Sequence, residues 1–112
     1  MKASRLGLTR ELTIPMTPDE CRSLEDVRRE IDAIDREIVS LIAQRARYVD
    51  AAARFKTSEQ HVAAPERLAA MLQIRREWGA EAGLDPDVIE DLYRRLVAYF
   101  IQRELAVHRN PR

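Results

Sequence analysis

Several residue types are scarce in this chain, and each scarcity excludes a class of protein. Cys21 is the only cysteine among 112 residues, which excludes an internal disulfide and a cluster of thiolate metal ligands. Glycines number three and aromatic residues make up 5% of the chain, and no stretch alternates polar and apolar residues as a half-buried strand does. This composition predicts an all-α protein.

Charge of one sign and long hydrophobic runs are lacking as well. Lys and Arg together number 19, as do Asp and Glu, so the formal net charge is zero. A general attraction to nucleic acid or to an anionic membrane is therefore not expected. No uncharged apolar run is long enough to span a bilayer, and Met1–Pro15 has no apolar core of a signal peptide. We expect a cytoplasmic protein.

The chain has room for one domain with a single modest core. Residues 1–16 read as a flexible N-terminal arm, and the sequence is compatible with a start of translation at either Met1 or Met16. We expect the helical domain to cover residues 17–109, with three helices of which the first is long.

The first helix is predicted from an apolar row in residues 23–56. Its members alternate steps of three and four residues, the spacing of one helical face: Leu24, Val27, Ile31, Ile34, Ile38, Leu41, Tyr48 and Ala52. Inside this row stands Arg45, and at its C-terminal end stands Lys56. Because an unpaired buried charge is costly, these two cations predict an anionic partner.

The length of this helix predicts a dimer. A helix of about 33 residues is roughly 50 Å long, whereas a globule of this chain length has a radius of gyration of about 13 Å. One chain therefore cannot wrap the whole row, so a second copy, the later helices or both must cover it. Dimerisation is the expected arrangement.

Capping residues mark where the first elements begin. Thr17, followed by a proline and two acids, is expected to open a single turn that ends near Arg22. Ser23 then caps the long helix, with Asp26 in the place of a capping-box acid. The long helix is expected to fray after Phe55 or Lys56.

Two more helices follow a loop predicted at Thr57–Ala63. The second restarts at Ala64–Arg67 with an early proline, and Gly83 is expected to end it in the left-handed conformation. Its apolar positions are Leu68, Met71, Leu72 and Trp78. The last helix opens at Asp85–Asp87, and its apolar row leads to Glu104 through Ile89, Leu92, Leu96 and Phe100.

Arg45, Lys56 and Glu104 share one property: each places charge on an otherwise apolar row. Any one of them alone is also explained by a long side chain that reaches solvent, but together they predict a polar pocket. Arg28 lies about 100° around the helix and roughly 25 Å along it from Arg45. It could reach the same small ligand only from a partner chain, and by pattern alone it is a solvated residue.

The chain also lacks the residues of several catalytic types. No serine or cysteine has a suitably placed histidine partner, and there is no glycine-rich phosphate loop. His61 and His108 are too few and too scattered for a metal site. We expect no cofactor and no metal. Cations and one carboxylate without a nucleophile fit the binding of an organic anion, or a reaction that needs only orientation and electrostatics.

Three segments carry a resemblance to a known family. They are Leu24-x-x-Val27-Arg28-x-x-Ile31-Asp32-x-Ile34-Asp35, Tyr48-Val49-x-Ala51-Ala52-x-Arg54-Phe55-Lys56-x-Ser58-Glu59 and Ala64-Pro65-Glu66-Arg67-x-Ala69-Ala70-Met71. They resemble the all-helical chorismate mutase family, most closely its isochorismate pyruvate lyase branch, over nearly all of residues 16–109. The short gap from Lys56 to Glu66 is similar to that of the lyase branch.

The resemblance implies an intertwined homodimer with two shared sites. Arg45 would bind one substrate carboxylate, and Arg28 of the other chain would bind the second. Lys56 would donate to the ether oxygen and to a nearby carboxylate. Glu66 matches a residue that contacts the ring hydroxyl in mutases, and Arg67 would help to close the site. The implied apolar wall consists of Val49, Ala52, Met71 and Ile101.

The resemblance also implies a cofactor-free pericyclic reaction on a chorismate-type dianion. Isochorismate would yield salicylate and pyruvate, the chemistry of salicylate and siderophore biosynthesis, and chorismate would yield prephenate. One departure is Glu104, which stands where the lyase has a glutamine and some mutases have a glutamate. An ionised carboxylate there would repel the substrate, whereas a protonated one could donate a hydrogen bond. The remaining alternatives are a mutase for an amino-substituted chorismate and a non-catalytic helical dimerisation module.

Overall fold

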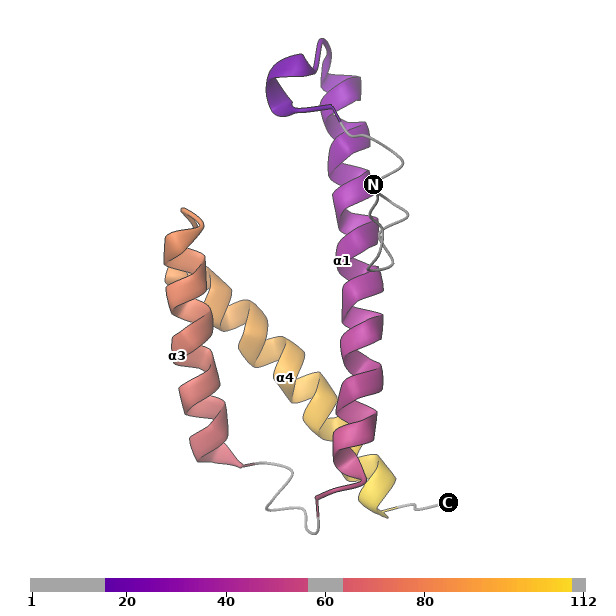
Figure 1. Ribbon diagram of the computed structural model, residues 1–112, viewed down its shortest axis with the longest axis vertical. Coiled ribbons are helices and arrows are strands. Elements are labelled where there is room, and N and C mark those ends of the chain that lie inside the picture. The colour runs from indigo at the N-terminus through magenta and orange to yellow at the C-terminus, as the bar shows by residue number, and fades with distance from the viewer. Residues whose placement is uncertain (1–15, 57–63, 110–112) are drawn as a thin grey trace, which may run out of the picture. The chain divides into compact units, whose positions relative to one another are not determined.

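The computed structural model describes residues 16–56 and 64–109, in two compact units that comprise Met1–Ile42 and Ala43–Arg112. Each unit is considered by itself. Outside the described residues lie the predicted loop at Thr57–Ala63 and all of the predicted arm except Met16. The described elements are the 3-10 helix η2 (Pro18–Glu20) and the α-helices α1 (Leu24–Ala53), α3 (Pro65–Glu81) and α4 (Pro86–Arg109). Throughout those residues the protein is all-α, as predicted (Figure 1).

The start of α1 follows the predicted cap with one difference. The Ser23 hydroxyl oxygen accepts a hydrogen bond of 3.0 Å from the Asp26 backbone N–H. The Asp26 carboxylate, however, accepts from the backbone N–H of Arg22 at 2.9 Å and not from that of Ser23. This bond is the main reason why the pKa of Asp26 lies below its ordinary value. The cap therefore stabilises both the helix and the residue before it.

The end of α1 differs from the prediction by two to three residues. The α-helix ends at Ala53, and the chain tightens into bonds between residues three apart, from Arg54 N–H to the Ala51 carbonyl and from Lys56 N–H to the Ala53 carbonyl. Such tightening is common at helix ends. Lys56 is thus held just beyond the helix, joined to it by backbone hydrogen bonds.

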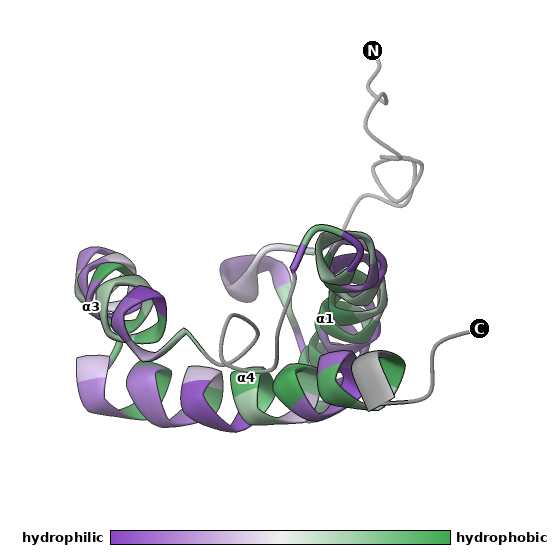
Figure 2. Ribbon diagram, turned by 90° about the horizontal axis from the view of Figure 1, so that it is seen from below, coloured by the Kyte–Doolittle hydropathy of each residue, from purple (hydrophilic) through white to green (hydrophobic). Residues whose placement is uncertain are grey.

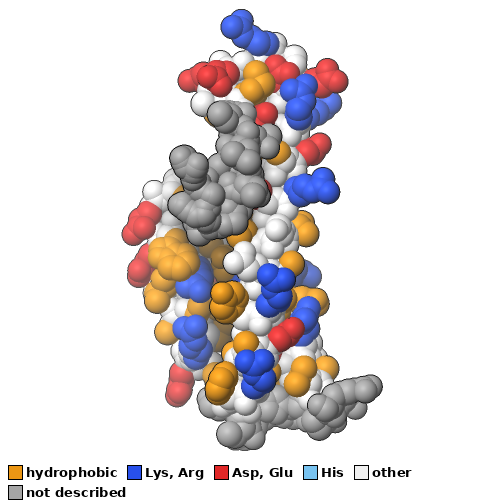
Figure 3. Space-filling view, turned by 45° about the vertical axis from the view of Figure 1, so that its right-hand side comes forward, with side chains coloured by type: hydrophobic (Ala, Val, Ile, Leu, Met, Phe, Trp, Pro, Cys, Tyr) orange, Lys and Arg blue, Asp and Glu red, His pale blue; other side chains and the backbone are white. Residues whose placement is uncertain are grey.

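The apolar row of α1 is solvent-exposed in the single chain. Its side chains keep between 38% and 62% of their accessible surface from the start of the helix to its middle: Leu24, Val27, Ile31, Ile34, Ile38 and Leu41. Exposed hydrophobic side chains stand among charged ones on the surface in Figure 3. A stripe of this kind on a soluble helix normally packs against something. Hydrophobic and hydrophilic residues interleave along each helix (Figure 2), and none of the described helices is apolar enough over a sufficient length to cross a membrane.

The second unit is built on close packing of α3 against α4, which meet at the turn that joins them and diverge from it in Figure 1. The turn between them ends α3 with Gly83 at φ 81°, the left-handed conformation that was predicted. The Leu84 N–H then donates to the Gly79 carbonyl at 2.8 Å. Near this turn, Arg76 of α3 forms ion pairs of 2.8 Å with Asp87 and with Glu90 in the N-terminal part of α4. The predicted starts of both helices at prolines are confirmed.

Gly79 permits a close approach of α3 to α4. A Cβ at this position would lie 2.7 Å from Cγ1 and 3.2 Å from Cβ of Ile89. We expect Gly79→Ala to lower the free energy of unfolding by about 1–2 kcal/mol, because overpacking outweighs the gain in helix propensity. Urea denaturation would measure this. In an Ile89→Ala background the closest atom, Cγ1, is absent and only the Cβ contact at 3.2 Å remains, so there the substitution should cost much less. An equal loss in both backgrounds would contradict the overpacking explanation.

Candidate active site

A cavity of about 520 Å³ lies inside the second unit, between the last turns of α1, the start of α3 and the C-terminal half of α4. This volume is within the usual range of small-molecule sites. Three cationic side chains line it, namely Arg45, Lys56 and Arg67, together with one carboxylate, Glu104. The three charges that interrupt the apolar rows are therefore brought to one pocket. The described lining carries a formal charge of +2.

Arg45 is held without an anionic partner. Its guanidinium carbon lies 5.0 Å from the centroid of the Phe100 ring, and no hydrogen bond or ion pair engages it in the part of the chain that the structure describes. Burial is the main cause that lowers the pKa of Arg45; Tyr93 raises it, and the charges of Arg75 and Arg67 lower it. An arginine stays protonated despite such shifts. A bound anion would relieve this repulsion.

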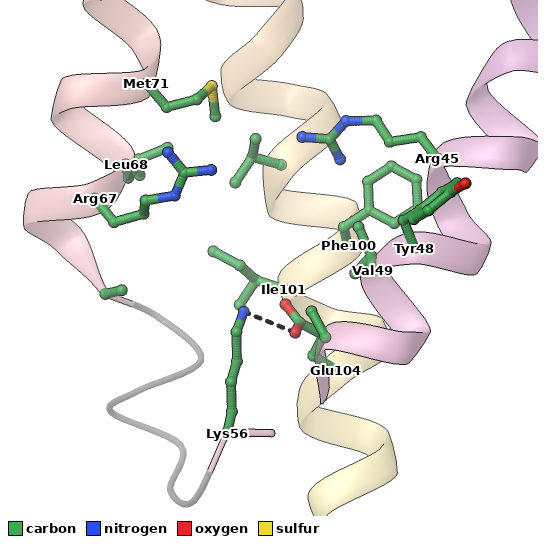
Figure 4. Close-up of a pocket in the computed structure, with 13 residues that line it drawn as sticks. Arg45, Tyr48, Val49, Lys56, Arg67, Leu68, Met71, Phe100, Ile101 and Glu104 are labelled. Atoms are coloured by element: carbon green, nitrogen blue, oxygen red, sulfur yellow. Dashed lines mark hydrogen bonds and ion pairs between the residues drawn. The ribbon is translucent and has the colours of Figure 1, made fainter. Parts of the chain in front are cut away.

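Lys56 and Glu104 form an ion pair on the opposite side of the pocket. The Nζ of Lys56 donates to Oε2 of Glu104 over 2.8 Å, drawn as the dashed line in Figure 4. The Glu104 side chain is 5% exposed and that of Lys56 is 25% exposed. A carboxylate so buried needs such a partner. The same contact occupies the amine that a substrate would need.

Arg67 extends from α3 into the cavity, and its guanidinium faces that of Arg45 across the space (Figure 4). No hydrogen bond or ion pair to Arg67 occurs among the described residues. The apolar wall contains all four of its predicted members: Val49, Ala52, Met71 and Ile101. Two guanidinium groups and an ammonium around an apolar wall can bind a small organic dianion.

Two of the predicted site residues do not line this pocket. Glu66 is exposed at the start of α3 and is not among the lining residues. Arg28 is exposed and belongs to the first unit. Sequence reasoning missed lining positions of three helices or their ends: Tyr48, Ala64, Leu68, Val97 and Phe100. Tyr48, Leu68 and Phe100 were on predicted apolar rows, whereas Val97 follows Leu96 of such a row and had no signal of its own.

No serine, cysteine or histidine lines the described pocket, and the described residues contain no group of acids, histidines and cysteines able to hold a metal ion. The described lining therefore offers no serine or cysteine nucleophile with a histidine base. What it supplies is positive charge, a few hydrogen-bond donors and shape. The described residues thus form an all-α protein whose pocket has a lining that fits an organic dianion.

Comparison with known proteins gives this class a family. The chain matches the family chorismate mutase type II over residues 27–105. It is 43% identical over 96 residues to an isochorismate pyruvate lyase of Pseudomonas aeruginosa. This match covers 86% of this chain and 95% of that protein. It is also 44% identical over 78 residues to the T-protein of Haemophilus influenzae and 35% identical over 75 residues to that of Enterobacter agglomerans. These matches cover 67% and 66% of this chain but only 20% of each T-protein.

The chain belongs to the chorismate mutase type II family. It is accordingly an enzyme of the pericyclic type that this family comprises. The resemblance stated from the sequence is thereby confirmed, as is the all-α fold class.

Proposed function

We propose that the protein is an isochorismate pyruvate lyase, which converts isochorismate into salicylate and pyruvate. The observation that carries this proposal is the likeness to a lyase of that name along 95% of its length. The charge of the pocket supports it, because a lining of +2 complements a substrate with two carboxylates. In the reaction the bond from the ring to the enolpyruvyl oxygen breaks while a ring hydrogen moves to the enolpyruvyl methylene, so no atom is gained or lost.

The proposed roles follow from the placement of the charges. Arg45 binds one carboxylate, since its guanidinium is partly buried and has no anionic partner in the described chain. Lys56 donates to the ether oxygen and to a nearby carboxylate, and it must leave Glu104 to do so. Glu104, when protonated, donates a second hydrogen bond to the ether oxygen. Because charge develops on that oxygen as the bond breaks, these donors stabilise the transition state more than the ground state.

Chorismate mutase activity is the second candidate, and the family match favours it. The same cations would hold chorismate in the conformation that rearranges to prephenate. Incubation of the protein with isochorismate and with chorismate separately, with salicylate, pyruvate and prephenate resolved, would distinguish the two activities. Conversion of chorismate alone would contradict the lyase proposal. Turnover of neither substrate would leave a mutase for an amino-substituted chorismate or a non-catalytic module. A chorismate-like dianion should raise the melting temperature of the mutase and leave that of the module unchanged.

We also propose that the enzyme is a cytoplasmic homodimer in which Arg28 of one chain completes the site of the other. The exposed row of α1 supports this, because six apolar side chains at 38% to 62% exposure would be unfavourable on a free monomer surface. Arg28 itself is exposed and makes no hydrogen bond or ion pair within the described residues, so it is available to a second molecule.

Complementation between mutants would test the shared site. We expect Arg28→Ala and Arg45→Ala each to be almost inactive. Mixed after subunit exchange, they should regain activity, because a heterodimer has one site with both arginines intact. The regained rate should approach about a quarter of wild type if exchange is random, since half of the dimers then carry one intact site. Light scattering checks the dimer itself; a stable folded monomer at micromolar concentration, or exchange without regained activity, would contradict the cross-chain role of Arg28.

A further inference from the structure

The C-terminal turns of α1 are joined to α4 by three specific side-chain interactions among the described residues of the second unit. Arg45 lies over the Phe100 ring, Lys56 pairs with Glu104, and Arg103 pairs with Asp50 over 2.8 Å. The close backbone packing in this unit is instead between α3 and α4. The placement of the α1 end against α4 therefore depends on side chains.

Two of these three interactions involve the substrate-binding groups. Arg45 and Lys56 both line the pocket, and a substrate carboxylate or ether oxygen competes for them. The Lys56–Glu104 ion pair must open when Lys56 turns to the substrate. The pair formed by Asp50 and Arg103 is different, because neither residue lines the pocket. It can remain intact throughout the reaction.

The hydrogen bonds of Arg103 suit a fixed connection between the end of α1 and α4. Its guanidinium donates to the Asp50 carboxylate at 2.8 Å and to the Tyr99 hydroxyl at 3.3 Å, so a residue one turn earlier on α4 orients it. These hydrogen bonds are the first causes that raise the pKa of Arg103, followed by the Asp50 charge. Arg103 directly precedes Glu104, and Asp50 is in the last turn of α1, just before Lys56.

We propose that Asp50 and Arg103 are positioning residues of the active site, which hold the end of α1 in register with α4 while the Lys56–Glu104 pair is open. This rests on the proposed pericyclic function. The substrate carboxylate is bound by Arg45 from the α1 side, whereas the donor Glu104 comes from α4. A displacement of the end of α1 relative to α4 therefore leaves substrate binding by Arg45 largely intact but misplaces Glu104 relative to the ether oxygen. Loss of the pair lowers kcat more than it raises KM.

The experiment compares Asp50→Asn, Arg103→Gln and the charge-swapped double variant Asp50→Arg with Arg103→Asp. We expect each single variant to lose about tenfold in kcat with KM changed by less than about twofold, since small displacements of catalytic groups are costly. The double variant should recover to within about threefold of wild type, because the ion pair is restored with opposite polarity. Asp87→Asn is the matched control: it breaks an exposed ion pair of the same length between α3 and α4 and should leave kcat unchanged.

Melting temperatures of all variants separate positioning from stability. An exposed ion pair contributes little to folding, so the single variants and the control should melt within a few degrees of wild type. Single variants with wild-type kcat would overturn the inference. A double variant as slow as the single variants would also overturn it. So would a loss of kcat in Asp87→Asn that parallels a loss of melting temperature, because kcat would then follow stability. A wild-type protein that turns over none of the substrates would overturn the proposed function and this inference with it. An active wild type with unaffected variants would overturn the inference alone.

Discussion

Arg45→Ala should lose about 10²- to 10³-fold in kcat/KM and keep its fold. The guanidinium is partly buried over Phe100 and has no anionic partner among the described residues, so its full binding capacity is available to the substrate. Removal of a charge-assisted donor from such a site has an effect of this size. The lost cation–π contact is worth only about 1 kcal/mol, so the stability should change little.

Two further variants make this prediction specific. Arg45→Lys keeps the charge but loses the planar fork that grips a carboxylate with two hydrogen bonds, so it should recover only part of the activity. Arg47→Ala removes an exposed arginine from the same helix, two residues away and not in the pocket lining, and should be neutral. If Arg47→Ala and Arg45→Ala were equally impaired in steady-state kinetics, the effect would be one of general charge and not of a carboxylate site.

Glu104→Gln should raise kcat/KM by about tenfold, because the amide N–H can donate to the ether oxygen where a carboxylate cannot. An ionised Glu104 acts against the reaction in two ways. It cannot donate to the ether oxygen, and it holds Lys56 in an ion pair of 2.8 Å. A glutamine amide can donate, and it holds Lys56 less strongly. The variant should therefore be faster than wild type.

The measurement is kcat/KM of both proteins with isochorismate under the same conditions. Glu90→Gln serves as the control, since Glu90 is a paired glutamate on α4 that does not line the pocket; its kcat/KM should match that of wild type. A Glu104→Gln variant slower than wild type would contradict the prediction and favour the carboxylate as the active form.

Much of the fold could be read from local signals. Ser23 as a cap, Pro65 and Pro86 as helix starts and Gly83 as a left-handed terminator were all predicted correctly. These features depend on the backbone conformation of a few neighbouring residues, which the residue types themselves restrict. The end of α1 was less accurate, because a helix end can tighten gradually and no residue near Ala53 forces a stop.

The burial of individual aromatic residues shows where local signals fail. Tyr48 and Phe100 both lie on apolar rows, yet Tyr48 is 71% exposed in the single chain and Phe100 is 2% exposed. Trp78, predicted to be apolar core or interface, is 54% exposed. Periodicity indicates that a face is apolar, but not which other element covers it. That depends on how helices distant in sequence pack, and for Tyr48 and Trp78 on whether a second molecule covers them.

The sequence by itself determined the helical class, the helix starts and three unusual charges, because each of these is set by residue type and spacing within a few turns. It could not determine that Lys56 pairs with Glu104, 48 positions away, that Arg103 reaches back to Asp50, or that Arg67 lines the pocket while its neighbour Glu66 does not. Only the tertiary structure decided these, since two adjacent helical residues point about 100° apart and the partner of a long side chain depends on where another helix passes.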